Sequence, residues 1–216
     1  MLWWDLLEEE VHDCQIDFWF LQSGWRSGQD WGESIEAYTE DALIRNIAFV
    51  FQNVRLFRIS IYENVRLANP DAQRTEVMEA LYQAGCDSIL DKFKDRENTV
   101  IGSKGVYLSG GEKQRIAIAR AMLKNAKIVI LDEASAAIDP ENEHELQKAF
   151  AHLMKGKTVM MIAHRLSSIR NVDEILVLED GKIVERGTDA ALMATDTKYR
   201  EYQTLYEQAN EWRVVR

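Results

Sequence analysis

The run KIVILDE at residues 127–133 decides the fold. It places four consecutive apolar residues between a lysine and two acids, a pattern typical of a strand buried on both faces of a parallel sheet. Because a parallel strand delivers its carboxyl end to the ligand crevice, Asp132 and Glu133 are candidates for chemistry. Asp132 is placed to hold a magnesium ion, and Glu133 to polarise an attacking water as a general base. A core strand that simply ends in two solvated acids gives the same pattern.

Further apolar strands and several helices surround this run. We predict strands at residues 47–51 and 158–163, and helices at residues 76–90, 110–123, 141–154 and 198–212. Residues 175–178 and 182–185 flank Asp180 and Gly181, which is a strong signal for a β-hairpin. Buried strands that alternate with helices predict an α/β fold with a mostly parallel sheet covered by helices.

The composition is that of a globular protein with an acidic balance. Of 216 residues 46% are hydrophobic, and 26 basic and 36 acidic residues give a net charge of −10. A phosphate backbone is bound by clustered Lys and Arg, so this balance argues against nucleic acid as a partner. No apolar stretch of the sequence approaches the roughly 20 residues that a membrane-spanning helix needs. The two cysteines make no disulfide framework and favour a reducing compartment.

A second motif, LSGGEKQR at residues 108–115, opens one of the predicted helices. Paired glycines at a helix start expose backbone N–H groups to an anion, and Ser109 adds a hydroxyl donor. The motif therefore favours a phosphate-binding corner at Ser109, Gly110 and Gly111. The other interpretation is an ordinary capped helix with a glycine-rich entry.

Two polar residues follow the other predicted strands. His164 comes directly after the strand at residues 158–163, where it can hydrogen-bond a terminal phosphate and the attacking water. Gln52 comes at the end of the strand at residues 47–51, where it can reach a metal ion or water. Taken singly, a histidine in such a place is more often structural, and Gln52 alone is a weak signal.

Together these motifs resemble the ATP-binding cassette (ABC) ATPases of membrane transporters, over about residues 38–212. Gln52 matches the family's Q-loop glutamine, residues 108–114 its signature, residues 128–133 its Walker B strand, residues 136–139 its D-loop and His164 its switch histidine. Residues 98–102 look like the segment that contacts the membrane domain in exporter-type members.

The resemblance implies a P-loop NTPase-like sheet with an α-helical signature subdomain, and ATP and Mg²⁺ as cofactors. It implies that Glu133, His164 and Gln52 are catalytic and that Asp132 and Gln52 serve the metal ion. It further implies that the ATP shared between two such domains is contacted by Ser109, Gly110, Gly111, Glu112 and Gln114, with Asp139 at the dimer contact.

The implied function is that of a nucleotide-binding domain, which couples ATP binding and hydrolysis to transmembrane transport. The partners are then a transmembrane permease domain and a second ABC ATPase domain, in a homo- or heterodimer, with no nucleic acid. The location is the cytoplasmic face of the cell membrane, reached through a membrane domain that the sequence does not contain.

The start of the chain departs from the family pattern. Residues 1–40 hold ten acids, one base and five of the six tryptophans. The family places its phosphate loop, Walker A or G-x-x-x-x-G-K-[ST], near residues 4–12. This chain has three adjacent glutamates there, at residues 8–10, which would repel a triphosphate. The aromatic residue that stacks on adenine is absent from the sequence as well.

We therefore expect residues 1–37 to be an aberrant segment, and residues 38–216 to be the ABC ATPase domain without its N-terminal β-subdomain. Within that domain, about residues 53–124 are expected to form the helical subdomain, and residues 125–216 the catalytic core and C-terminal helix.

A shifted reading frame, in a chain truncated at its N-terminus, explains the segment. Tryptophan has a single codon, so Trp3-Trp4 read from the third codon base yields Val-Gly, and degenerate codons then permit a complete phosphate loop. A spliced or diverged N-terminus is an alternative, as is a degenerate subunit that lends only its signature to an intact partner. A soluble cassette ATPase acting on DNA or ribosomes fits less well, because the sequence lacks a basic stripe and a coiled-coil insertion.

Overall fold

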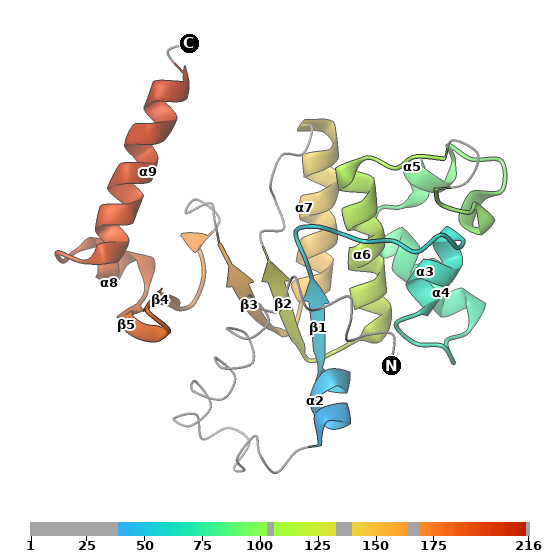
Figure 1. Ribbon diagram of the computed structural model, residues 1–216, viewed down its shortest axis with the longest axis horizontal. Helices are drawn as coiled ribbons and strands as arrows, with labels where there is room; N and C mark the ends of the chain where they lie inside the picture. Colours follow the sequence, from blue (N-terminus) through green and yellow to red (C-terminus); the bar gives the residue numbers. More distant parts are fainter. Residues whose placement is uncertain (1–38, 103–105, 133–139, 164–168, 215–216) are drawn as a thin grey trace. The chain divides into compact units, whose positions relative to one another are not determined.

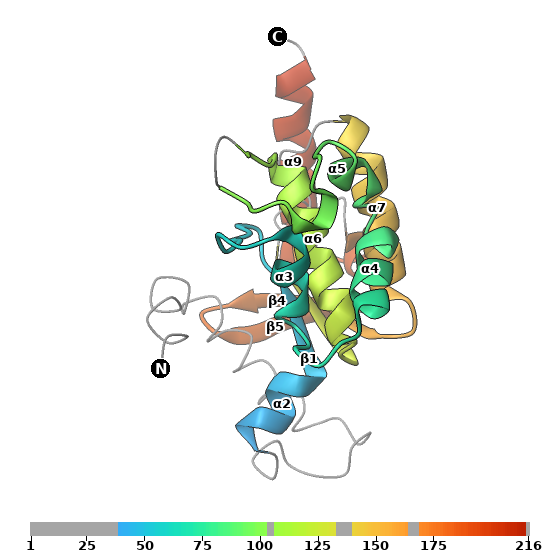
Figure 2. The ribbon, with the colours of Figure 1, turned by 90° about the vertical axis from the view of Figure 1, so that its right-hand side faces the viewer.

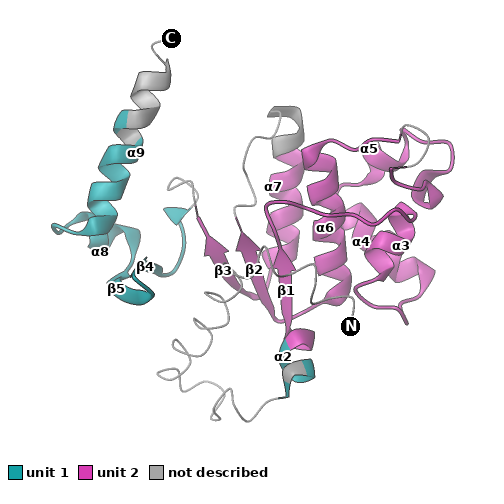
Figure 3. Cartoon of the chain, viewed as in Figure 1, with its two compact units in different colours: residues 1–43, 169–216 teal, residues 44–168 magenta. Residues whose placement is uncertain are grey.

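The computed structural model describes residues 39–102, 106–132, 140–163 and 169–214 (Figure 1). The chain divides into two units (Figure 3). One unit comprises residues 44–168, and the other comprises residues 1–43 and 169–216. Within the described ranges, none of the helices combines the length and the hydropathy that crossing a bilayer requires.

Three parallel strands form the sheet of the unit at residues 44–168, in the order β1-β2-β3. Their bounds are Ile47–Val50 for β1, Ile128–Asp132 for β2 and Thr158–Ile162 for β3. In register, Val50 lies beside Leu131. Asp132, the last residue of β2, lies beside Ile162, the last residue of β3. The predicted strands and their parallel pairing are confirmed, and all three are almost purely apolar, as buried parallel strands are.

The helices of this unit lie between the strands along the chain. Their bounds are Ile61–Arg66 for α3, Arg74–Gln83 for α4, Asp87–Leu90 for α5, Gly110–Lys124 for α6 and Pro140–Met154 for α7, with a 3-10 helix, η2, at Arg96–Asn98. A further helix, α2 at Glu40–Asn46, leads directly into β1. The central helix is α6, which packs against α3, α4, α7 and β1 (Figure 2). The helices predicted at residues 110–123 and 141–154 are confirmed as α6 and α7.

One face of the sheet shares an apolar core with these helices. Val50, Val129 and Leu131 from the strands and Ile116 and Leu146 from α6 and α7 are each 1% exposed or less. Full burial of such a side chain stabilises the fold by about 1.5–3 kcal/mol. The core therefore fixes α6, and with it the corner at residues 109–111, against the strands.

The single helix predicted at residues 76–90 is wrong. The structure divides it into α4, which ends at Gln83, and α5, which begins after Cys86. Between them Gly85 has a φ of +67°, a left-handed conformation that a glycine adopts without steric cost. The helical spacing of Val77, Leu81 and Ala84 hid the break, because all three side chains face the same core up to the turn.

A hairpin and two helices make up the described C-terminal part of the other unit. The antiparallel strands are β4 at Ile175–Glu179 and β5 at Lys182–Gly187, and the helices are α8 at Asp189–Met193 and α9 at Lys198–Val214. Asp180 and Gly181 have φ values of +49° and +72°, as the two central residues of a type I′ turn require. The predicted hairpin is therefore confirmed, and so is the last predicted helix, as α9.

Candidate functional site

The carboxyl edge of the sheet carries the two described residues of the predicted metal site. Asp132 ends β2 and is half-buried. Gln52 lies two residues beyond the end of β1 and is exposed. Because Val50 and Leu131 are partners in register, these two strand ends are neighbours. The structure thus brings Gln52 and Asp132 to the same edge of adjacent parallel strands.

These two side chains offer the oxygen donors that Mg²⁺ prefers. The ion is usually bound by one or two protein oxygens, by water and by the phosphates of a substrate. Within the described ranges, no three His, Cys, Asp or Glu side chains gather into a metal site of their own. A carboxylate and an amide oxygen at one sheet edge therefore fit a magnesium ion that is shared with a phosphate ligand.

Three of the predicted site residues, Glu133, Asp139 and His164, lie outside the described residues. In the sequence Glu133 directly follows Asp132, and His164 comes two residues after Ile162, which pairs with Asp132. Their roles as general base, dimer contact and phosphate ligand stay predictions.

The predicted phosphate-binding corner lies at the N-terminus of α6. Ser109 is the N-cap, with an extended backbone, and its Oγ accepts a hydrogen bond from the Glu112 N–H at 3.3 Å. The Ser109 N–H donates in return to Glu112 Oε2 at 2.7 Å. This reciprocal pair is a capping box. It uses the N–H groups of Ser109 and Glu112, whereas those of Gly110 and Gly111 take no part in it.

Gly110 marks the open side of this corner. A Cβ at this position would meet no heavy atom of the described residues within 4 Å, its own helix turn and chain neighbours aside. Ser109 and Gly110 are both exposed, whereas Gly111 is buried. An exposed start of a helix with open space beside it is a place that an anion can approach.

Glu112 faces inward, toward the protein. Its side chain is 6% exposed, and its Oε1 accepts a hydrogen bond from Lys92 Nζ. Burial by itself raises the pKa of the Glu112 carboxyl, but the hydrogen bonds from Lys92 and Ser109 outweigh it and hold the pKa below its ordinary value. Glu112 was predicted to contact the nucleotide, but both of its carboxylate oxygens are hydrogen-bonded within the chain. Gln114, the other predicted contact of α6, is buried as well, at 5% exposed.

The sequence reasoning missed Lys92. This residue precedes Glu112 by 20 positions, follows α5 and belongs to no recognised motif. The capping box itself had a signal, because serine followed three residues later by glutamate is its signature. No spacing rule predicts an ion pair between segments so far apart in the sequence.

Comparison with known proteins decides which family this site belongs to. The sequence model of the ABC transporter family matches residues 22–136, more than half of the chain. The chain belongs to the ABC transporter family. The stretch matched to the ABC transporter model includes Gln52, the corner at Ser109 and Asp132, so the resemblance based on these motifs is confirmed. The match begins inside residues 1–37, which lie outside the described residues, and the shifted reading frame stays a prediction.

Several known proteins are similar to most of this chain. The ATP-dependent lipid A-core flippase of Pectobacterium atrosepticum is 45% identical over 175 residues, which are 81% of this chain and 30% of the flippase. The flippase of the same name from Aliivibrio fischeri is 44% identical with the same coverage. ABC transporter B family member 14 of Arabidopsis thaliana is 41% identical over 177 residues, 82% of this chain and 14% of that protein. The chain thus spans less than a third of the length of these relatives.

Proposed function

We propose that this chain is the nucleotide-binding domain of an exporter-type ABC transporter, which couples ATP binding and hydrolysis to transport by a paired membrane domain. The observation that carries the proposal is the open corner at Ser109 and Gly110, in a chain with Asp132 at the end of β2 and Gln52 two residues beyond the end of the adjacent β1. The relatives named as flippases and as a B-family transporter support the exporter type.

The edge of the sheet serves the chain's own nucleotide in this proposal. Asp132 and Gln52 hold the magnesium ion, which supplies positive charge to the phosphates when bound. Glu133 accepts a proton from the attacking water, and His164 hydrogen-bonds the terminal phosphate. The described part of this arrangement supports the assignment, because Gln52 follows β1 and β1 pairs with β2, which ends in Asp132.

The corner at Ser109 serves the nucleotide of a second ABC ATPase domain. The Ser109 hydroxyl and the N–H groups of Gly110 and Gly111 donate hydrogen bonds to its phosphates, and the positive end of the α6 dipole adds attraction. Asp139 lies at the contact between the two domains. A transmembrane domain is the other partner, and the cytoplasmic face of the membrane is the location that these partners imply.

Nucleotide-dependent pairing tests the proposal directly. The chain is mixed with an ABC ATPase domain that carries an intact phosphate loop, and association is followed by analytical ultracentrifugation with and without ATP and Mg²⁺. We expect association only with ATP. Ser109→Glu should weaken it at least about tenfold, because a like charge placed against a phosphate costs several kcal/mol.

Thr75→Glu is the matched control, since it adds the same charge to an exposed position of α4. It should leave the association unchanged. Pairing that ignores ATP, or that survives Ser109→Glu, contradicts the proposal. Labelled ATP retained by the chain alone would show that residues 1–37 do not prevent nucleotide binding. Retention only in the presence of the partner would indicate that this chain contributes its signature, residues 108–114, to the nucleotide site of the partner.

A further inference from the structure

The corner at Ser109 is tied to a second segment of the chain by two connections. Glu112 of α6 pairs with Lys92, just after α5. One helix turn further on, Arg115 Nη1 donates to the carbonyl oxygen of Gly85 at 2.8 Å, just before α5. The first two turns of α6 are therefore bonded to the segments at both ends of α5, and only the connection at Glu112 also belongs to the capping box.

The two partners of the ion pair differ sharply in exposure. The Glu112 side chain is 6% exposed and the Lys92 side chain 58%. Removing one partner from a buried charge leaves that charge uncompensated, whereas replacing an exposed lysine leaves no cavity. Lys92 is therefore a surface residue whose main described interaction is with a buried carboxylate.

The electrostatic surroundings of Glu112 are simple in the described chain. Lys92 is the charged group that bonds to it, and Ser109 supplies the backbone donor. The Cys86 thiol lies at the start of α5, and burial is the main cause that raises its pKa. Arg115 lowers the pKa of this thiol, whereas the charges of Asp87 and Glu112 raise it.

We propose that Glu112 and Lys92 are positioning residues for the phosphate-binding corner, and that Glu112 is not itself a nucleotide contact. Lys92 keeps Glu112 in place, Glu112 holds the Ser109 N–H, and the corner then presents the Ser109 hydroxyl and the Gly110 and Gly111 N–H groups to a ligand. This inference rests on the proposed function for its ligand, and on the geometry alone for the link from Lys92 to Ser109.

A mutant cycle in the isolated full chain tests the link. The variants are Lys92→Met, Glu112→Gln, the double variant, and Lys94→Met as the control at an exposed lysine of the same segment. NMR follows the exchange of the Ser109 and Glu112 amide protons and the titration of the Glu112 carboxyl. We expect Lys92→Met to raise the Glu112 pKa and to speed exchange about fivefold, the effect of a lost cap. Lys94→Met should change neither.

The double variant decides whether Lys92 acts through Glu112. The neutral amide of Glu112→Gln can still accept the Ser109 N–H but needs no cation, so Lys92→Met should have no further effect in that background. Equal effects of Lys92→Met in both backgrounds, or no effect in either, would overturn the link.

ATP-dependent pairing with the intact domain tests the functional half. Lys92→Met leaves the buried Glu112 carboxylate without its cation, so pairing should weaken about fivefold, in step with the faster amide exchange. Glu112→Gln should pair within about threefold of the unmodified chain, because its amide oxygen keeps the capping bond.

A large loss of pairing for Glu112→Gln, with normal amide exchange, would make Glu112 a nucleotide contact and refute the positioning role. Absence of pairing in the unmodified chain would refute the proposed function instead, while the exchange cycle would still decide the link between Lys92 and Ser109.

Discussion

Arg120 of α6 donates two hydrogen bonds to Asn64 of α3. Its Nε reaches the Asn64 carbonyl oxygen at 2.9 Å, and its Nη2 reaches Oδ1 at 3.3 Å. Asn64 is fully buried, and its amide also binds the backbone of Phe57 and Ser60. One asparagine therefore connects the central helix with the segment that runs from Gln52 to α3.

Asn64→Ala should destabilise the chain strongly. It removes the partner of the Phe57 N–H, of the Phe57 carbonyl and of one donor of Arg120, and each buried unsatisfied group costs about 1–3 kcal/mol. We expect the free energy of unfolding in urea to fall by at least about 2 kcal/mol. Asn69→Ala is the control, because Asn69 is exposed and accepts one long bond from Asp71. If both variants lose a similar amount of unfolding free energy, the hydrogen bonds of Asn64 do not stabilise the chain more than those of an exposed asparagine.

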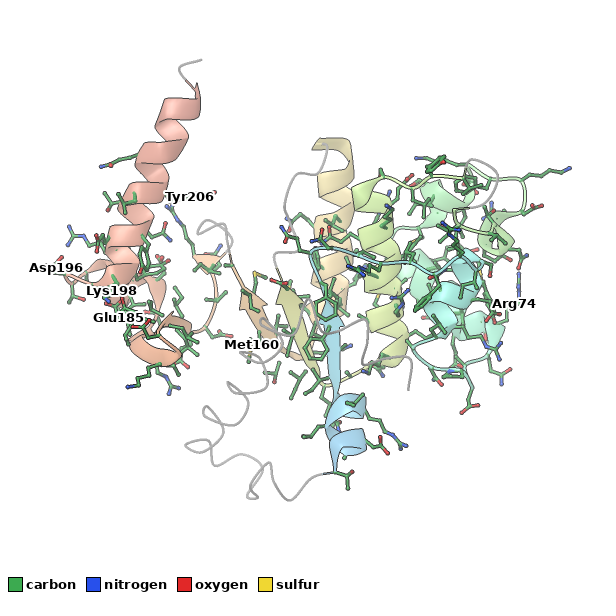
Figure 4. The ribbon with its side chains drawn as sticks, in the orientation of Figure 1. Arg74, Met160, Glu185, Asp196, Lys198 and Tyr206 are labelled. Carbon is green, nitrogen blue, oxygen red and sulfur yellow. The ribbon has the colours of Figure 1, made fainter. Side chains whose placement is uncertain are left out.

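Glu185 caps α9 from outside the helix (Figure 4). Its carboxylate, on β5, accepts the Lys198 N–H at 2.7 Å and the Tyr199 N–H at 3.0 Å. The negative charge also lies at the positive end of the helix dipole. Glu185→Ala should therefore cost about 1–2 kcal/mol and lower the helical content of α9.

The measurement is amide exchange along α9 together with thermal unfolding. Glu174→Ala serves as the control in the same hairpin, because Glu174 forms an exposed ion pair with Arg186, which is worth about 0–1 kcal/mol. If exchange in the first turn of α9 is as slow in Glu185→Ala as in the unmodified chain, the carboxylate does not cap the helix.

The sequence predicted the strands and the long helices well, because their apolar spacing is local. It failed where one glycine interrupts that spacing, since the positive φ of Gly85 has no periodic signature. The short helix α3 was missed because it is stabilised by tertiary bonds, for example Asn64 to Arg120, rather than by its own pattern.

The sequence predicted those parts of the site that lie at strand ends and helix starts. Gln52 and Asp132 lie at one sheet edge, as parallel strands require, and Ser109 begins a helix as its motif indicates. The inward turn of Glu112 was not predictable, because it depends on Lys92, a residue brought near by the turn at Gly85.

Cys86 should be inert in the folded chain. Its side chain is fully buried, and burial raises the pKa of the thiol to about 12. At pH 8 the thiolate population is then about three orders of magnitude below that of an ordinary cysteine. In a Cys14→Ser background, iodoacetamide should modify the chain only after urea unfolding, as read by mass spectrometry. Rapid alkylation under native conditions would contradict the burial of this residue.

Gly110→Ala separates stability from function at the phosphate-binding corner. A methyl group there meets open space, and alanine is favoured over glycine in a helix by up to about 1 kcal/mol. The variant should therefore unfold at the same or a higher urea concentration. In the proposed function a phosphate binds close to Gly110, and an added methyl group would crowd it, so ATP-dependent pairing should weaken at least about tenfold, or by 1.4 kcal/mol.

Gly181→Ala should show the opposite behaviour and makes a matched control. Its surroundings are equally open, but its φ of +72° is left-handed, which costs an alanine about 1–2 kcal/mol. We expect lower stability with unchanged pairing, because Gly181 lies in the β4–β5 turn and not at the start of α6. Normal ATP-dependent pairing by Gly110→Ala would mean that the ligand does not bind close to Gly110.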